Sequence, residues 1–445
     1  MIICSSAPQG QLSPGLATSY EILDDLHILF NLRQGVTFHN GENFNAKAVK
    51  FSLERFLDPE ANYANAGQFS AIKGLEIVDD YQVILELNEL DASILDKLTA
   101  QLYIVPPLYY TAKGAEDFAK APIGTGLFRF ISHERDVATK LAAFESYWEG
   151  SSKGKPLVDE VIFKVIPEAA SRVSALQLGT VDIISQVPAD MTPLIERSGN
   201  RLVYQDTASL LMVWFASDIY PFLQDTRVRQ ALNYAVNSDA ILASLAGGYG
   251  TRLASPLTPL SLGFDESLVP YPYDPEKAKA LLAEADFDMS QALEFSYTSN
   301  IDKTIAEAIA ADLNKLGLKV TLKAMDLNAF NDAWFRFSEP NPTALFIASW
   351  GGLFDPASEA FFLHSGYGAS YYNNPEVDSQ LQAAQATLNL DERAAHYQEV
   401  TKLTHEDPAG IYLWSPASLY GVSARVLDWQ THPRDIIIVS NTALK

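Results

Sequence analysis

The chain has 445 residues, of which 48% are hydrophobic, and 55 acidic against 32 basic residues give it a formal net charge of −23. This length exceeds one ordinary hydrophobic core and predicts two or three domains. The strong negative charge repels phosphate backbones and anionic lipids, which argues against a nucleic-acid-binding or membrane-surface protein.

Cysteine usage and the N-terminal residues say little about the compartment. Cys4 is the only cysteine, so the sequence predicts neither an intrachain disulfide nor a thiolate-rich metal site. No run approaches 18 apolar residues, and the first ten residues have neither the basic region nor the apolar region of a signal peptide. We therefore expect that any export signal was removed or lost upstream.

Residues 1–120 predict short strands around a helix. The segment 26–32 alternates partly, and Asn40-Gly41 is a strong signal for a chain reversal. A helix follows, with Asn45 as its N-cap and Pro59 as its end. The apolar residues at 83, 85 and 87 alternate cleanly, which predicts a half-buried strand.

After residue 121 strands and helices alternate. Strands are expected within 121–130 and 154–167, and a helix within 168–179 that ends at Gly179. The segment 225–248 carries one apolar stripe, restarts at Ser238 and ends near Gly247, which predicts a pair of helices.

The segment 274–350 has the clearest pattern. A helix begins at Asp274-Pro275, and it is followed by strand 293–299, helix 304–317, strand 318–324 and strand 343–349. Parallel strands joined by right-handed crossovers through helices explain this order. The sequence therefore predicts an α/β fold with a second α/β lobe separate from the first.

Six stretches together resemble the family 5 extracytoplasmic solute-binding proteins of ABC importers, which include oligopeptide, dipeptide, glutathione and nickel binders. They are "LSPGLATSYEILDDLHILFNLRQGVTFHNGENFNAKAVKFSLER", "APIGTGLFRF", "SALQLGTVDII", "DTRVRQALNYAVNSDAIL", "YPYDPEKAKALLAEA" and "SWGGLFDPASEAFFLHS". The resemblance implies a two-lobe type II periplasmic-binding-protein-like fold with an extra subdomain in the first lobe. It implies capture and delivery of a solute rather than chemistry.

The resemblance also implies a domain arrangement. Residues 1–120 would form the extra subdomain of lobe I, 121–255 its core, 426–445 its completion and 256–425 lobe II. Hinges are expected near 255–259 and 423–427. The implied partners are a small peptide-like or other organic solute and the transmembrane subunits of an ABC permease. A monomer outside the cytoplasm, without a cofactor or a metal, is expected.

Three departures from the family pattern bear on these expectations. Forty to fifty residues usually precede the "LSPGLATSYE" region and supply the first strand of lobe I, so the chain is expected to lack that strand and to expose an edge prone to association. Peptide binders resemble one another in an aspartate three residues after the loop tryptophan, where this chain has Leu353. Nickel binders have an arginine before a "YW" pair, where it has Ala143.

The stretch "SWGGLFDPASEA" supplies the principal candidate site. It follows an apolar run, and ligands of open α/β sheets lie beyond the carboxyl ends of the strands. Trp350 and Gly351 are expected at a cleft wall, with Phe354 as a further candidate; each aromatic could equally serve packing. Asp355, followed by Pro356, fits a helix N-cap better than a ligand contact. Weaker candidates for the cleft are Trp214, Tyr367 and Tyr371.

Enzyme and sensor alternatives remain open at this stage. His364, His396 and His405 belong to no HExxH or Cys/His cluster, and the chain has no GxSxG, P-loop or dinucleotide fingerprint after a strand. A glycosidase needs only paired carboxylates, so turnover of oligosaccharides or peptides would reveal it. A sensor or chaperone-like module could use the same cleft without any transporter.

Overall fold

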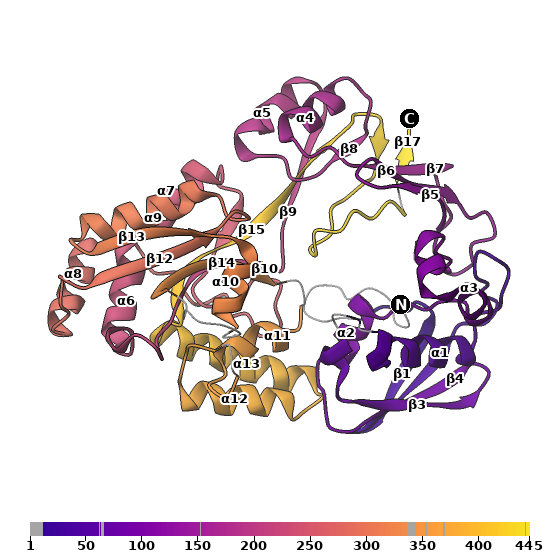
Figure 1. Ribbon diagram of the computed structural model, residues 1–445, viewed down its shortest axis with the longest axis horizontal. Helices are drawn as coiled ribbons and strands as arrows, with labels where there is room; N and C mark the ends of the chain where they lie inside the picture. The colour runs from indigo at the N-terminus through magenta and orange to yellow at the C-terminus, as the bar shows by residue number, and fades with distance from the viewer. Residues whose placement is uncertain are drawn as a thin grey trace.

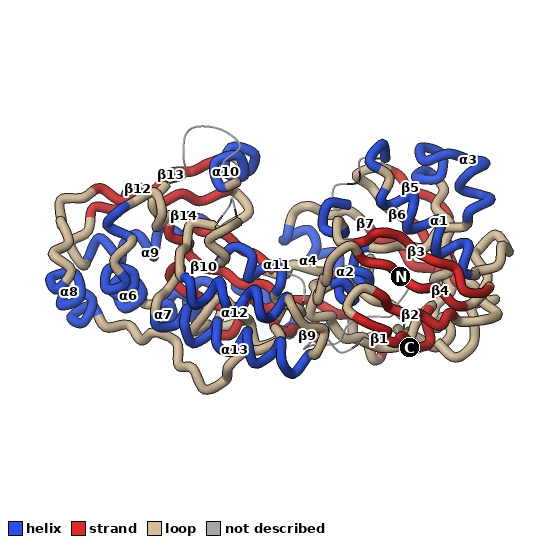
Figure 2. Tube along the Cα trace, turned by 90° about the horizontal axis from the view of Figure 1, so that it is seen from below, coloured by secondary structure: helices blue, strands red, loops and turns tan. Residues whose placement is uncertain are grey.

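A computed structural model describes residues 12–445 apart from 62, 64–65, 152, 336–342, 352–353, 368–369 and 441. The molecule is elongated, with the N-terminal sheet at one end and a larger sheet at the other (Figure 2). Strands β9 and β15 run from the larger sheet toward the part of the molecule that contains α4, α5 and β8 (Figure 1). No helix of the described chain is both long and apolar enough to cross a bilayer.

The N-terminal subdomain is an antiparallel sheet covered by helices. Its strands lie in the order β1-β2-β4-β3, with bounds Ala17–Asp24, His27–Leu32, Gln82–Leu87 and Ile72–Asp79. Fully buried residues of β2 and β4 alternate with partly buried ones, as the sequence predicts. Helix α1 (Ala46–Leu57) begins at Asn45, whose side chain accepts hydrogen bonds from Lys47 N and Ala48 N. Two 3-10 turns (Pro59–Ala61, Ala66–Phe69) and helices α2 (Ile94–Gln101) and α3 (Pro107–Lys120) complete the unit.

A small three-stranded sheet follows, in the order β5-β6-β7. Its bounds are Phe128–Glu134, Ala138–Ala143 and Glu160–Lys164. Among the described strands β7 pairs with β6 alone, and Ile162 and Phe163 on β7 remain exposed. The sheet thus has one free, apolar edge. The chain continues through α4 (Ala169–Gln177), β8 (Ile183–Ile184), the turn Ala189–Met191 and α5 (Thr192–Arg197).

The largest sheet has the order β11-β15-β10-β14-β12-β13, and β8 and β9 also pair with β15. The bounds from β9 to β15 are Arg201–Asp206, Ser209–Phe215, Gly250–Arg252, Ala292–Thr298, Lys319–Met325, Leu345–Gly351 and Gly410–Val422. Strand β12 is parallel to both β13 and β14, and α9 (Lys303–Lys315) joins β12 to β13. The predicted β-α-β order of an α/β lobe is confirmed.

Helices cover both faces of this sheet. One hydrophobic core contains Leu211, Val213 and Phe215 of β10, and the other contains the alternate residues Leu210, Met212 and Trp214. Helices α6 (Thr226–Ala235), α7 (Ser238–Leu245), α8 (Pro275–Glu284) and α9 contribute to the first core, and α10 (Leu327–Trp334), α11 (Ala357–Ala360), α12 (Pro375–Gln385) and α13 (Leu390–Glu406) to the second. Short turns at Pro221–Leu223 and Phe361–Leu363 and the strand pair β16 (Val426–Leu427) and β17 (Ala443–Leu444) complete the described elements.

Strand β15 belongs to both lobes. Its first part, up to Trp414, pairs with β10, whereas Ala417–Val422 pairs with β9. The range 121–255 also contains two strands, β10 and β11, that belong to the same sheet as β12 to β14. Helices α6 and α7 of this range pack on that sheet. The strand partners therefore change near Thr207 and again near Pro416.

Candidate functional site

The candidate loop begins at the carboxyl end of β14. This strand pairs antiparallel with β10, so that Trp350 lies opposite Leu210 and Gly351 opposite Ser209. Trp350 is half-buried, while Ser349 and Gly351 on either side of it are exposed. The indole therefore has one part packed against neighbouring residues and another part exposed to solvent.

The backbone of the neighbouring strand leaves no room for a side chain at Gly351. Its φ is 138°, and a Cβ at this position would lie 2.4 Å from the carbonyl oxygen of Ala208. A side chain would have to push the backbone of the neighbouring strand away, so a glycine allows β14 to end directly against β10. Gly352 and Leu353 lie outside the described residues.

Four predicted site residues come together in one aromatic cluster. Trp350 and Tyr367 lie at its half-buried margin, and Trp214 and Tyr371 lie inside it. The ring of Trp350 is 4.4 Å from that of Phe362 in an edge-to-face arrangement, and Tyr367 is 5.6 Å from Phe362. The cluster thus supports a partly exposed aromatic wall on a rigid apolar base.

Phe362 and Trp334 are two members of this cluster that sequence reasoning missed. Phe362 also contacts Trp214 and Trp334, at centroid distances of 5.9 and 5.8 Å. The hydroxyl of Tyr371 donates to the backbone oxygen of Trp334, which fixes α10 beside the cluster. The aromatic pair at 361–362, only a helical turn beyond the loop, was the available signal for Phe362. Nothing local in the sequence places Trp334 there.

Phe354 and Asp355 do not belong to the aromatic wall. Phe354 is fully buried, and the guanidinium carbon of Arg434 lies 4.9 Å from its ring centroid. Asp355 is also buried; its Oδ1 accepts a hydrogen bond from Ala357 N at 3.0 Å, and both carboxylate oxygens accept from Arg393 Nη2 at 2.7 and 2.5 Å. Burial raises the pKa of Asp355 above its ordinary value, although Arg393 pulls it down. The carboxylate is occupied by internal partners.

The three histidines of interest have local structural partners. The Nδ1 of His364 accepts from Gly366 N at 2.9 Å, His396 bonds the side chain of Gln380, and His405 bonds the backbone oxygen of Ala254. Within the described residues no group of three or more His, Cys, Asp and Glu side chains could hold a metal ion.

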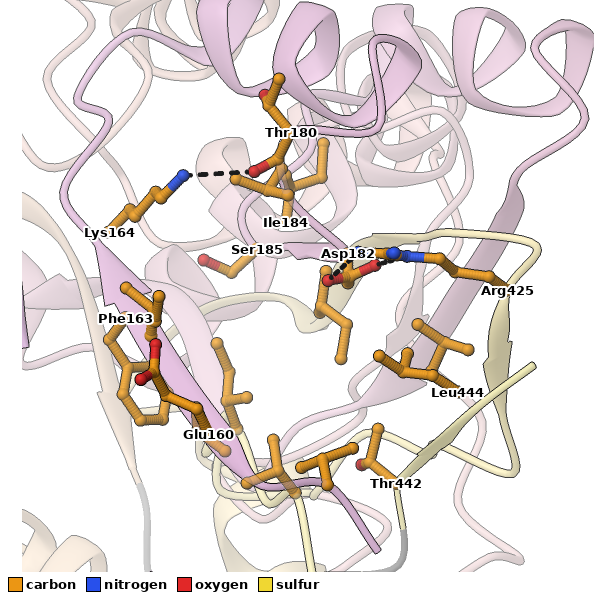
Figure 3. Close-up of a pocket in the computed structure, with 18 of the residues that line it drawn as sticks. Glu160, Phe163, Lys164, Thr180, Asp182, Ile184, Ser185, Arg425, Thr442 and Leu444 are labelled. Carbon is orange, nitrogen blue, oxygen red and sulfur yellow. Dashed lines mark hydrogen bonds and ion pairs between the residues drawn. The ribbon is translucent and has the colours of Figure 1, made fainter. Parts of the chain in front are cut away.

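A separate cavity of about 410 Å³ lies between β7 and β8 (Figure 3). Glu160, Phe163 and Lys164 line it from β7, and Asp182 and Ile184 line it from the opposite side. Lys164 Nζ donates to the backbone oxygen of Thr180 at 3.2 Å across it, and Arg425 forms an ion pair with Asp182 at its border. None of the predicted site residues lines this cavity. It adjoins the free edge of β7 and is distinct from the tryptophan loop.

Known proteins with the same architecture match nearly the whole chain. The model of the bacterial extracellular solute-binding proteins, family 5 (middle), matches residues 11–372. Heme-binding protein A of Haemophilus influenzae is 32% identical over 95% of this chain and 82% of its own length. The glutathione-binding protein GsiB of Pectobacterium atrosepticum is 28% identical over 89% of this chain and 79% of its own.

Solved structures agree with this assignment. The structure of HbpA2 from Haemophilus parasuis has a TM-score of 0.87 and 26% identity, covering 100% of this chain and 93% of that one. The match therefore includes both lobes and the N-terminal subdomain. The chain belongs to the bacterial extracellular solute-binding proteins of family 5.

Proposed function

We propose that this protein captures a neutral, anionic or N-blocked organic solute against the aromatic wall formed by Trp350, and that free-N-terminus peptides are poor ligands. As a family 5 protein it is the substrate-binding component of an ABC importer. The observation that carries the proposal is the contrast between a half-exposed Trp350 and an Asp355 whose carboxylate is occupied by Arg393 and Ala357 N.

Free-N-terminus peptides are disfavoured for an electrostatic reason. An ammonium group buried in a closed site needs a carboxylate nearby, because an unpaired charge in a water-poor site costs several kcal/mol. Leu353 has no charge to offer. Asp355 is turned toward Arg393 and the start of α11, so it is a poor partner for a ligand ammonium.

A thermal-shift panel tests this preference. We expect tri-alanine to give a smaller shift than N-acetyl-tri-alanine, which lacks the ammonium group, or than hemin, since heme is the ligand named for a similar protein. Ligand at about 100 times its dissociation constant stabilises the folded protein by ~2.7 kcal/mol, a clear rise in melting temperature. If unmodified peptides give the largest shifts, the proposed preference is wrong. The variant Leu353→Asp is the matched gain-of-function arm, because it should create a peptide response that the parent chain lacks.

Solute capture requires the two lobes to close. We place the hinge at Thr207 and Pro416, where the chain passes between the lobes, rather than in the ranges 255–259 and 423–427. The backbone nitrogen of Thr207 donates to the Pro416 oxygen at 3.1 Å, and Ser415 Oγ donates to the Thr207 oxygen at 2.8 Å. A change of twist at this point would move the β9 part of the molecule relative to the sheet of β10 and β14.

Small-angle scattering tests the closure. Contacts made only in the closed state shift a two-state equilibrium, so the radius of gyration should fall when a solute from the thermal-shift panel saturates the protein. The control is a panel solute that gives no thermal shift, at the same concentration. An unchanged radius of gyration under saturation with a stabilising solute would contradict hinge closure.

The oligomeric state, the partner proteins and the cellular compartment are inferred from the family. We infer a monomer that delivers its solute to the transmembrane subunits of an ABC permease outside the cytoplasm, without a cofactor and without turnover. The family is extracellular by its description and consists of solute-binding proteins. A sensor or chaperone-like role would use the same cleft; uptake of the solute by cells that carry the cognate permease distinguishes transport from it. A glycosidase or peptidase would instead show turnover by the purified protein.

A further inference from the structure

Four buried charges meet where the tryptophan loop approaches the first lobe. We call Asp96, Asp355, Arg393 and Arg434 the four-charge cluster. They come from α2, the start of α11, α13 and the C-terminal segment, which are far apart in the sequence and adjacent in space. The exposed side-chain fractions are 5% for Asp96, 6% for Asp355, 0% for Arg393 and 9% for Arg434. Two positive and two negative charges make the cluster neutral as a whole.

One half of the cluster belongs to the second lobe. Arg393 holds both carboxylate oxygens of Asp355 and donates to the backbone oxygen of Ala384 at 3.1 Å. Asp355 in turn caps the first turn of α11 through Ala357 N. This half therefore fixes the Phe354–Asp355 turn to α12 and α13.

The other half belongs to the first lobe. Arg434 forms an ion pair with Asp96 of α2, and its Nη1 lies 3.5 Å from the hydroxyl of Thr99. The C-terminal segment around Arg434 is itself attached to the far part of β15, because Tyr420 bonds Asp435 and packs 5.1 Å from Trp429. Asp96 and Arg434 thus lie on the side of the hinge opposite to Asp355.

Two contacts join the halves. The backbone nitrogen of Asp355 lies 3.5 Å from Asp96 Oδ2, and the guanidinium carbon of Arg434 lies 4.9 Å from the ring centroid of Phe354. Figure 1 shows α2 on the side of the N-terminal subdomain that faces α11, away from the paired strands β9 and β15. A hinge at Thr207 and Pro416 would separate these groups when the lobes open, because they are attached to different lobes.

We propose that Asp96 and Arg434 are positioning residues that dock the Phe354–Asp355 turn against the first lobe when the lobes close. The docking fixes where the Trp350 end of β14 stands relative to that lobe, and so it sets the width of the solute site. This inference rests on the proposed function. Under this proposal α2 of the N-terminal subdomain takes part in closure of the lobes. Solute binding at the aromatic wall by itself would not need α2.

The test uses the whole chain without solute, so that it does not depend on the identity of the ligand. Arg434→Gln removes the charge that holds Asp96 and the cation over Phe354, and Asp96→Asn/Arg434→Gln removes both charges together. The matched control is Arg425→Gln, which breaks the exposed pair with Asp182 in the same C-terminal part of the chain. Amide hydrogen exchange and the radius of gyration are measured for each protein.

In Arg434→Gln we expect about tenfold faster exchange in α2 and in residues 354–357, with little change elsewhere, and a larger radius of gyration. The double variant should recover overall stability, because it leaves no buried charge unpaired, but it should keep the faster exchange in α2 and in residues 354–357 and the larger radius of gyration, because the docking groups are still absent. Faster exchange spread uniformly over the chain would indicate a purely structural role and overturn the proposal. So would exchange in these two segments equal to that of Arg425→Gln. If unmodified peptides give the largest thermal shifts but exchange increases in these two segments as expected, the proposed ligand preference is wrong and the docking contact is supported.

Discussion

Replacing Arg393 by methionine should lower the free energy of unfolding by about 3 to 5 kcal/mol. The Arg393 side chain is fully buried and holds Asp355 through both carboxylate oxygens. Methionine fills much of the same volume but leaves the carboxylate without its cation. Chemical denaturation followed by circular dichroism measures the loss.

The pH dependence identifies the cause of that loss. Burial already raises the pKa of Asp355, and removing Arg393 removes the main influence that lowers it. A carboxyl whose folded-state pKa exceeds its unfolded-state value favours folding below the unfolded-state pKa, and this contribution disappears as the pH rises through the folded-state pKa. The deficit of Arg393→Met should therefore shrink as the pH is lowered through that range.

A matched substitution at the surface provides the control. Lys279→Met removes a lysine from an exposed pair with Glu276, and exposed pairs contribute less than about 1 kcal/mol. Asp355→Asn combined with Arg393→Met should recover part of the lost stability, because the unpaired charge is then absent. An Arg393→Met deficit of the same size as that of Lys279→Met would contradict the assignment of a buried ion pair.

Trimming Trp350 to alanine should weaken solute binding by about 1 to 3 kcal/mol, that is roughly 5- to 150-fold in the dissociation constant. The indole is half-buried, and its packed part contacts Phe362, so some stability will be lost as well. The loss of binding should nevertheless exceed the loss of stability, because the accessible part of the ring meets solvent in the free protein. Isothermal titration with the best solute of the thermal-shift panel, alongside denaturation, measures both quantities.

Trp334→Ala is the control for this prediction. Trp334 is 4% exposed in the same aromatic cluster and 4.2 Å from Phe346, so its truncation should cost about 3 to 5 kcal/mol of stability. If Trp350→Ala shows the same large loss of stability as Trp334→Ala, Trp350 is a core residue and the aromatic wall is not a binding surface.

The sequence alone determined the local elements and the family. Asn45 before an apolar helical stripe predicted the start of α1, and alternation in 82–87 predicted β4, because capping and periodicity are properties of adjacent residues. The apolar run before Trp350 similarly predicted a strand that ends at the tryptophan, and β14 ends at Gly351. The six family-like stretches predicted a family 5 solute-binding protein, which the comparisons confirm.

Only the tertiary structure decided which of these elements share a sheet and which side chains meet. Strand β10 reads locally as an ordinary apolar run, yet its pairing with β14 brings it into the second lobe and sets Trp214 beside Phe362. The partners of Asp355 lie 38 residues away at Arg393 and 259 residues away at Asp96. Such contacts depend on packing between distant segments, and the buried charges are satisfied only after the lobes assemble. No local pattern of residues could have indicated them.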